Sequence, residues 1–314
     1  MLHHPKDRRA VGYFIFASAL LALNWNLDLA FGAIGLSGGI AVGLKWFLVF
    51  IQCFTAITIT TIAHNHNHNK IWKNKALNIF TDYWITCFYG FPTFAWIPTH
   101  NRNHHKFNNK EGDYTITYRY SEANNLLTLL SYPSVSSWFQ QTPIKDYLKM
   151  MWKRRKPRFW YFISQYVVVI AFFGLAFLID WRKALLYVVL PTQVGMFAVL
   201  VFNYLQHVHC DEESKFNHSR NIVGPVMNMF LFNNGYHTVH HDNPALHWSD
   251  GPAAHAKIAD KIHPSLNEHS ILWLLFRVYF LGIFLKKFRT QSMRVARMAE
   301  HEHEAQDNQL AAAE

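Results

Sequence analysis

The chain has 314 residues, of which 51% are hydrophobic and only 16% are charged, against roughly 25% charged residues in an ordinary soluble domain. A mean hydropathy of −0.03 is too low for a bundle of membrane helices alone, so the composition indicates a membrane part together with a sizeable polar part. The formal net charge of +10 suits anionic lipid, an acidic protein or nucleic acid, and we exclude nucleic acid because the basic residues flank apolar segments.

Four apolar stretches approach the roughly 20 residues that a helix needs to cross a bilayer. Arg8 and Arg9 precede the first of them, as in a signal peptide, but no small-residue cleavage site follows, so we expect a helix that is not removed. Pro191 lies inside the fourth stretch and is tolerated in a membrane helix. The predicted spans are 11–30, 42–63, 160–179 and 184–205.

Basic residues are distributed unevenly around these stretches, and this bias predicts orientation. Seven lysines and arginines lie between positions 145 and 158, whereas residues 31–41 carry no charge. Both termini and the long middle segment are therefore expected in the cytoplasm, with two helical hairpins in the membrane. The predicted segments are 1–63 (N-terminal tail and first hairpin), 64–159 (cytoplasmic), 160–206 (second hairpin), 207–285 (cytoplasmic cap) and 286–314 (polar tail).

Two further segments allow more than one structure. The aromatic-rich stretch 78–97 is long enough for a fifth span, but such a crossing would put His100 on the opposite side from His64. We therefore expect a helix that lies in the membrane interface. The tail after Lys286 is predicted to be a polar helix or a disordered end.

The chain contains an unusually large number of histidines, twenty in all, and many of them lie in short motifs. The motifs are HNHNH at 64–68, HNRNHH at 100–105, NYLQH at 203–207 and HTVHH at 237–241. Residues three or four apart share a helical face. We therefore expect His64 to pair with His68, His100 with His104, and His237 with His240, while His105 and His241 occupy neighbouring faces.

The remaining histidines are not expected to bind metal. His66 faces away from its neighbours and is predicted to be exposed to solvent or to support a ligand. His209 is expected to point away from His207, and His247 either supports a ligand or has no role. We interpret four others as ordinary residues of the cap: His218, His255, His263 and His269.

A single HxxxH motif is often only a polar helix end, but three clusters on one predicted membrane face favour shared metal coordination. A histidine-rich metal transporter is the alternative from another class. It would place its ligands near the middle of its spans, whereas these histidines lie at or beyond the helix ends.

Imidazole ligands suit zinc, copper, iron and nickel. The chain has no HExxH motif of a zinc hydrolase and no CxxC pair among its three cysteines. Nine imidazoles are too many for one ion, so two ions are implied. Two irons beside a hydrocarbon phase suit O₂ activation.

The motif order HxxxH, HxxxHH, NxxxH, HxxHH resembles the membrane fatty acid desaturase and hydroxylase superfamily. The stretches HNRNHHKFNNKEGDY (100–114) and NNGYHTVHHDNP (233–244) are similar to its second and third histidine boxes, and the resemblance runs from His64 to Trp248. It implies an all-α integral membrane fold, with four transmembrane helices and a cytoplasmic helical cap that holds a di-iron site. The implied ligands are His64, His68, His100, His104, His105, His207, His237, His240 and His241, with Asn203 approaching one iron through water.

The resemblance also implies the reaction: oxygen-dependent desaturation of a fatty acyl chain, with two iron ions as cofactor, O₂ as co-substrate and no catalytic residue beyond the metal centre. The substrate is an acyl-lipid, an acyl-CoA or an acyl carrier protein. A hydroxylase and an alkene- or alkyne-forming oxidase of the same superfamily are the alternatives. The implied location is a bacterial inner membrane, with the active site facing the cytoplasm.

Electrons must come from outside the chain, because it has neither a cytochrome b5 HPGG signature nor an iron–sulfur motif. We expect a separate donor such as a ferredoxin. The basic segment 145–158 is interpreted as a docking site for an acidic donor, a contact for anionic lipid, or simply a determinant of topology.

Overall fold

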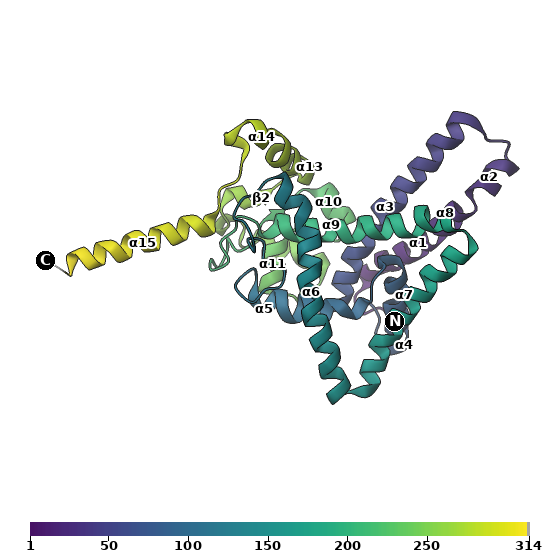
Figure 1. Ribbon diagram of the computed structural model, residues 1–314, viewed down its shortest axis with the longest axis horizontal. Helices are drawn as coiled ribbons and strands as arrows, with labels where there is room; N and C mark the ends of the chain where they lie inside the picture. Colours follow the sequence, from purple (N-terminus) through teal and green to yellow (C-terminus); the bar gives the residue numbers. More distant parts are fainter. Residues whose placement is uncertain (313–314) are drawn as a thin grey trace. The chain divides into compact units, whose positions relative to one another are not determined.

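The computed structural model describes residues 1–312 and is built almost wholly from helices (Figure 1), as the all-α prediction requires. Within these residues the strands are β1 (Asn221–Ile222) and β2 (Asn267–Glu268), which pair in parallel. The chain forms two compact units. Unit 1 is Met1–Arg102 with Gln141–Val199, and unit 2 is Asn103–Gln140 with Leu200–Glu314.

Unit 1 contains the long apolar helices. Its elements are η1 (Pro5–Asp7), α1 (Arg8–Trp25), α2 (Leu27–Ala33), α3 (Gly38–His68), α4 (Lys75–Tyr89), η2 (Thr93–Ala95), the π-helix η3 (Ile97–His104), α7 (Lys156–Ile179), α8 (Trp181–Ala184) and the π-helix η4 (Leu185–Val189). Three helices contribute residues to both units: η3, whose last two residues belong to unit 2, α6 (Leu126–Arg154) and α9 (Leu190–His207).

Unit 2 consists mainly of short helices joined by loops. They are α5 (His105–Phe107), α10 (Pro225–Phe230), α11 (His237–Asp242), η5 (Trp248–Asp250), α12 (Gly251–Ala256), η6 (Ala259–Lys261), η7 (Pro264–Leu266), α13 (Ile271–Leu275), the π-helix η8 (Phe276–Leu281), α14 (Gly282–Phe284), η9 (Lys286–Phe288) and α15 (Met293–Ala311).

Three helices are long and apolar enough to cross a membrane: Gly38–His68, Lys156–Ile179 and Trp181–His207. They match the second, third and fourth predicted spans. The first predicted span is a bent pair instead, because α1 and α2 meet at 68°. At the bend the Asn26 side chain donates to the carbonyl oxygen of Ala22, and such side-chain bonds compete with a regular helix. Residues 1–312 therefore contain three candidate spans, or four if the bent pair is one span.

The stretch 78–97 is interrupted rather than continuous. α4 ends at Gly90, which has a left-handed φ of 82°, and a Cβ there would lie only 2.8 Å from Cβ of Thr192. The 15 residues of α4 extend about 22 Å, which is less than the roughly 30 Å of a hydrocarbon core. α4 is therefore too short for a fifth span, and its place in the interface stays a prediction.

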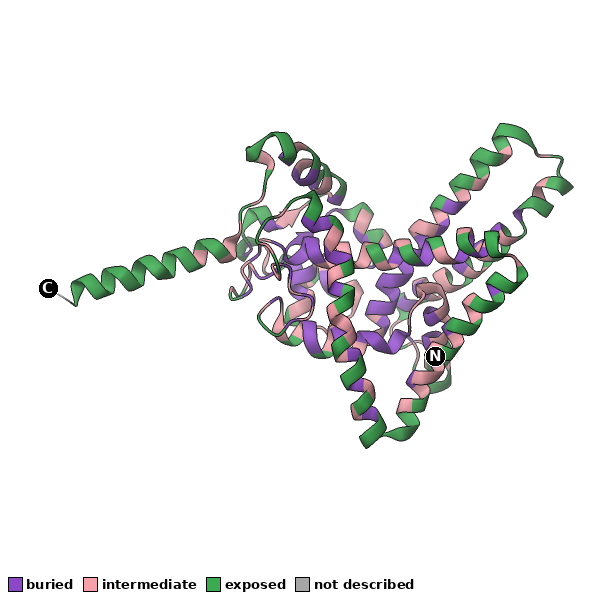
Figure 2. Ribbon diagram, in the orientation of Figure 1, coloured by how far each residue is buried: buried purple, intermediate pink, exposed green. Residues whose placement is uncertain are grey.

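Burial in α3 changes along the helix, as Figure 2 shows. Its first half is largely exposed, whereas most residues from Thr55 to His66 are buried. α15 has no buried residue and is exposed throughout from Met298 to Ala311. Most of the described part of the polar tail is thus a helix, one of its two predicted forms.

Candidate metal centre

Four histidines of unit 2 converge in its interior. His104 ends η3, His207 ends α9, and α11 supplies His237 and His241. One ring nitrogen from each lies within 4.8 Å of the others, and only His241 is not fully buried. This arrangement has the size of a first coordination sphere.

The distances between these nitrogens fit ligands of one ion. His237 Nε2 lies 3.0 Å from His207 Nε2 and 3.1 Å from His241 Nε2. A ring nitrogen offers one N–H or one in-plane lone pair, so His237 Nε2 cannot form a well-directed hydrogen bond with both. Two ligands at 90° around an ion, each about 2.1 Å from it, lie about 3.0 Å apart. The donor set therefore fits a metal that imidazole favours, such as iron.

His104 is oriented by a buried carboxylate. Its Nδ1–H donates to Asp113 Oδ2 at 2.8 Å, with the hydroxyl oxygen of Thr115 also 2.9 Å from Nδ1. Burial alone would raise the pKa of Asp113. The charge and hydrogen bond of His104, together with the bonds from Thr115, lower it by more, so the pKa of Asp113 is held well below its usual range. With the proton on Nδ1, Nε2 of His104 is the atom able to bind metal.

The surroundings also keep His241 neutral. Burial lowers its pKa well below the ordinary value, and the neighbouring rings of His237, His104, His105 and His207 lower it further. Neutral imidazole is the form that binds a metal ion.

A second group of histidines lies in unit 1, at the end of α3 and in η3. The ligand nitrogens of His64, His68 and His100 lie within 4.8 Å of one another, and the Nε2 atoms of His64 and His100 are 2.9 Å apart. Nδ1 of His64 is 3.0 Å from Asn65 Oδ1, an arrangement that leaves Nε2 of His64 for a metal. In unit 2, His105 and His240 form a further close pair, with ring centroids 4.6 Å apart.

The predicted pairing of His100 with His104 on one face is wrong. The ring of His100 contacts His64 and His68, whereas His104 contacts His207 and His241. The reason is that Ile97–His104 is a π-helix, whose wider turn moves residues four apart off a common face.

The predicted pairing of His237 with His240 is also wrong. His241 joins His237 instead, with ring centroids 4.6 Å apart, while His240 contacts His105. In an α-helix with 3.6 residues per turn, a residue four positions along lies about 40° from the first, and one three positions along about 60°. The spacing of four is therefore the closer match on α11.

His66 is fully buried, so its predicted solvent exposure is wrong. Its Nε2 lies 3.2 Å from Asp82 Oδ1, and Asp82 also accepts from Lys70 and from the hydroxyl of Tyr161. Burial raises the pKa of Asp82, but His66 and Lys70 lower it more, to about 2. Asp82 is the only acidic residue of α4, a signal that sequence analysis overlooked.

His218 lies closer to the histidine cluster than predicted. It is buried, and its ring centroid lies 5.7 Å from that of His241, while its Nε2 lies 3.5 Å from Asp242 Oδ1. It thus packs beside His241, a candidate ligand, rather than being an ordinary cap residue. His247 instead receives the backbone N–H of Ser249 and caps η5.

Asn203 belongs to a hydrogen-bonded chain that leads towards His104. Its side-chain nitrogen donates to the hydroxyl of Tyr132 at 2.6 Å, and that hydroxyl donates to the backbone oxygen of Thr115 at 2.6 Å. The bond to Tyr132 uses the side-chain nitrogen of Asn203 and does not involve its side-chain carbonyl oxygen. A water bridge from Asn203 to a metal stays a prediction.

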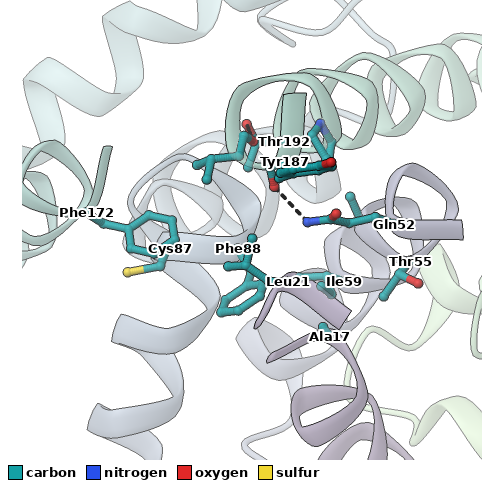
Figure 3. Close-up of a pocket in the computed structure, with 13 residues that line it drawn as sticks. Ala17, Leu21, Gln52, Thr55, Ile59, Cys87, Phe88, Phe172, Tyr187 and Thr192 are labelled. Carbon is teal, nitrogen blue, oxygen red and sulfur yellow. Dashed lines mark hydrogen bonds between the residues drawn. The ribbon is translucent and has the colours of Figure 1, made fainter. Parts of the chain in front are cut away.

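Unit 1 also contains a small, mostly apolar pocket (Figure 3). Its apolar lining includes Ala17 and Leu21 of α1, Ile59 of α3 and Phe172 of α7, and none of its lining side chains is charged. One part of the wall is polar: Gln52 donates to the backbone oxygen of Tyr187 at 2.7 Å, as the dashed line in Figure 3 marks. Its amide oxygen accepts from Asn24 at 2.6 Å.

Comparison with known proteins identifies a family. The family model described as fatty acid desaturase matches residues 39–273, about three quarters of the chain. No curated protein and no solved structure matches.

Proposed function

We propose that this chain, which belongs to the fatty acid desaturase family, catalyses the oxygen-dependent desaturation of a fatty acyl chain. In this reaction, two hydrogens leave adjacent carbons and O₂ is reduced to two waters. Four electrons are needed: two come from the substrate and two from a separate donor. The membrane setting of the proposal is supported by the family and by the apolar helices.

The observation that carries the proposal is the convergence of four imidazoles in unit 2, with Asp113 orienting His104. We propose that this four-histidine cluster binds one iron. In all, nine histidines are the proposed ligands of two irons, and Asn203 is proposed to approach one of them through water. The ligands are His64, His68, His100, His104, His105, His207, His237, His240 and His241. When bound, the irons supply O₂ activation and the oxidation of an unactivated C–H bond.

The residues around the cluster would act on its ligands. Asp113 holds the proton on Nδ1 of His104, and so directs Nε2 to the metal. Tyr132 connects the segment that contains Asp113 and Thr115 to Asn203. We propose that this network keeps His104 and Asn203 in fixed orientations during turnover.

The pocket of unit 1 is our candidate for the acyl chain. Its lining positions on α3 run from Gln52 to Ile59, and at a rise of 1.5 Å per residue they lie between about 18 and 8 Å before His64 along the helix. Uncharged, mostly apolar walls would exclude water from a hydrocarbon chain. We propose that the hydrogen-bonded amide of Gln52 closes the far end.

We also propose that a separate donor, such as a ferredoxin, supplies electrons. The exposed basic run from Lys153 to Arg158 supports an acidic partner, although the same charges suit anionic lipid. We propose a bacterial inner membrane as the location, and the charge bias around the apolar helices supports an active site that faces the cytoplasm.

The test is expression in a bacterial host, followed by mass spectrometry of total acyl chains and iron analysis of the purified protein. We expect new unsaturated chains and two irons per chain, both lost in a His240→Ala/His241→Ala variant. Feeding labelled acyl-CoA, acyl carrier protein or phospholipid to membranes then identifies the carrier. Hydroxy acids or terminal alkenes in place of unsaturated chains would reassign the reaction within the superfamily, and active protein without iron would refute the proposal.

A further inference from the structure

A short helical segment of unit 2 exposes an unusually apolar face. α13, η8 and α14 form one run from Ile271 to Phe284. Four aromatic rings follow one another along it, with successive centroids 6.0, 5.2 and 6.0 Å apart. The large exposed side chains are Leu272, Trp273, Phe276, Phe280, Ile283 and Phe284, which are between 46% and 72% exposed.

The opposite face of the segment is already used. Ile271, Leu274, Val278 and Tyr279 are buried in the same hydrophobic core as the last turns of α9. The helix Trp181–His207, which contains α9, is a candidate membrane span. The exposed aromatic face therefore belongs to a helix that packs against the end of a membrane-spanning segment.

The length of the segment rules out a further span. Its 14 residues extend about 21 Å, less than the roughly 30 Å of a hydrocarbon core. A helix that is too short to span, with one face packed on protein and the other apolar, suits a position in the plane of the interface. Aromatic side chains are enriched at that depth.

The charges of the segment favour lipid as the occupant. Residues 271–289 contain no acidic side chain, and Lys286, Lys287 and Arg289 follow the aromatic face and are exposed. Arg277, the only charged residue within the run, pairs with Glu268. Cations next to an apolar face match anionic headgroups above acyl chains.

We propose that Ile271–Phe284 is an in-plane membrane anchor: its exposed aromatic face inserts among lipid acyl chains, and Lys286 and Lys287 contact anionic headgroups. This attaches unit 2 to the bilayer through a second element besides α9. The proposal does not rest on the proposed reaction.

The test attaches an environment-sensitive fluorophore to the full chain in lipid vesicles. The label is placed in the aromatic face through Phe280→Cys, and a matched control carries it on helix α15 through Val295→Cys. Labelling of the unsubstituted protein gives the blank for Cys53, Cys87 and Cys210. We expect blue-shifted emission from position 280, quenched at least twofold by lipids that carry a nitroxide on the acyl chain, and no such quenching at 295. Quenching of the label at position 280 by aqueous iodide alone would overturn the proposal. So would a blue shift without lipid quenching, because that would show a protein contact such as a second copy.

A second experiment leaves the packed core untouched. Lys286→Gln/Lys287→Gln is compared with Lys257→Gln, an exposed lysine of the same unit, in vesicles of phosphatidylcholine with and without phosphatidylglycerol. We expect lipid quenching at position 280 to increase with phosphatidylglycerol in the parent and in Lys257→Gln, but not in the double variant. An equal response of all three proteins would contradict the headgroup contact.

Discussion

The two histidine clusters use the same ligand atoms in different surroundings. In unit 2 the rings lie in the interior, and a buried carboxylate orients one of them. In unit 1, His68 and His100 are only partly buried, and His64 is oriented by the amide of its neighbour Asn65. The acidic residue near the unit 1 cluster, Asp82, bonds His66 instead of a ligand.

This difference teaches that an acid beside a histidine motif can have two separate roles. Asp113 bonds His104, a proposed ligand, and is expected to control metal binding. Asp82 connects the end of α3 to Lys70 and to Tyr161 of α7, so it is expected to hold helices together. The comparison can be tested by changing one element of each cluster at a time.

Loss of a ligand should have the largest effect in both clusters. We expect His237→Ala and His68→Ala each to reduce desaturation more than 100-fold, beyond the 10- to 100-fold typical of residues that only support a ligand. His263→Ala, at an exposed position, is the control and should keep full activity. Product formation and iron per chain are the measurements. Full activity in either ligand variant would remove that residue from the proposed ligand set.

Asp113→Asn should have the next largest effect. All four hydrogen bonds described for the carboxylate come from donors: His104 and the Asn109 N–H on one oxygen, and the N–H and O–H of Thr115 on the other. In Asp113→Asn, the side-chain NH₂ would replace one of these two oxygens in either orientation of the amide, and it would then face donors instead of acceptors. We therefore expect a 10- to 100-fold loss of iron affinity or activity.

The control for this variant is Glu111→Gln, two residues earlier in the same loop and exposed. Iron affinity is measured by competition with a chelator. If both variants bind iron as tightly as the parent protein, Asp113 does not orient a ligand.

Asp82→Asn should lower stability while leaving iron in place. The carboxylate accepts from Tyr161 and pairs with His66 and Lys70, and its side chain is 11% exposed. Loss of a hydrogen bond to a charged group costs about 1.5–3 kcal/mol, which should be visible as a lower Tm in detergent. Unchanged Tm with loss of iron would reverse the distinction between the two acids.

The sequence was sufficient to predict the helical class, three of the long apolar helices and the convergence of histidines from separated motifs. These features depend on apolar length and on residue type, which can be read locally. The break at Asn26 could not be predicted in the same way, because it depends on a side chain competing for a backbone carbonyl.

The division of the histidines between clusters was predicted less well. The pairing of His100 depends on a π-helix. The spacing of histidines in the sequence does not distinguish a π-helix from an α-helix, so it could not predict this pairing. Asp113 lies nine positions after His104, beyond the short helix α5 and a loop whose path is decided by its own hydrogen bonds. The hydrogen-bond partners of a histidine are therefore harder to predict than its presence in a cluster.

The smallest effect is expected from a substitution in the apolar pocket of unit 1. Ala17 is buried in the pocket wall, and Ala17→Leu adds three carbons there. If the pocket holds the end of the acyl chain, products should shift towards shorter chains without a general loss of activity, because the variant fills space far along the chain from the histidines. Ala22→Leu makes the same change on the exposed side of α1 and should leave the distribution unchanged. Mass spectrometry of the unsaturated products measures both, and an equal decrease across all chain lengths in Ala17→Leu would place the acyl chain elsewhere.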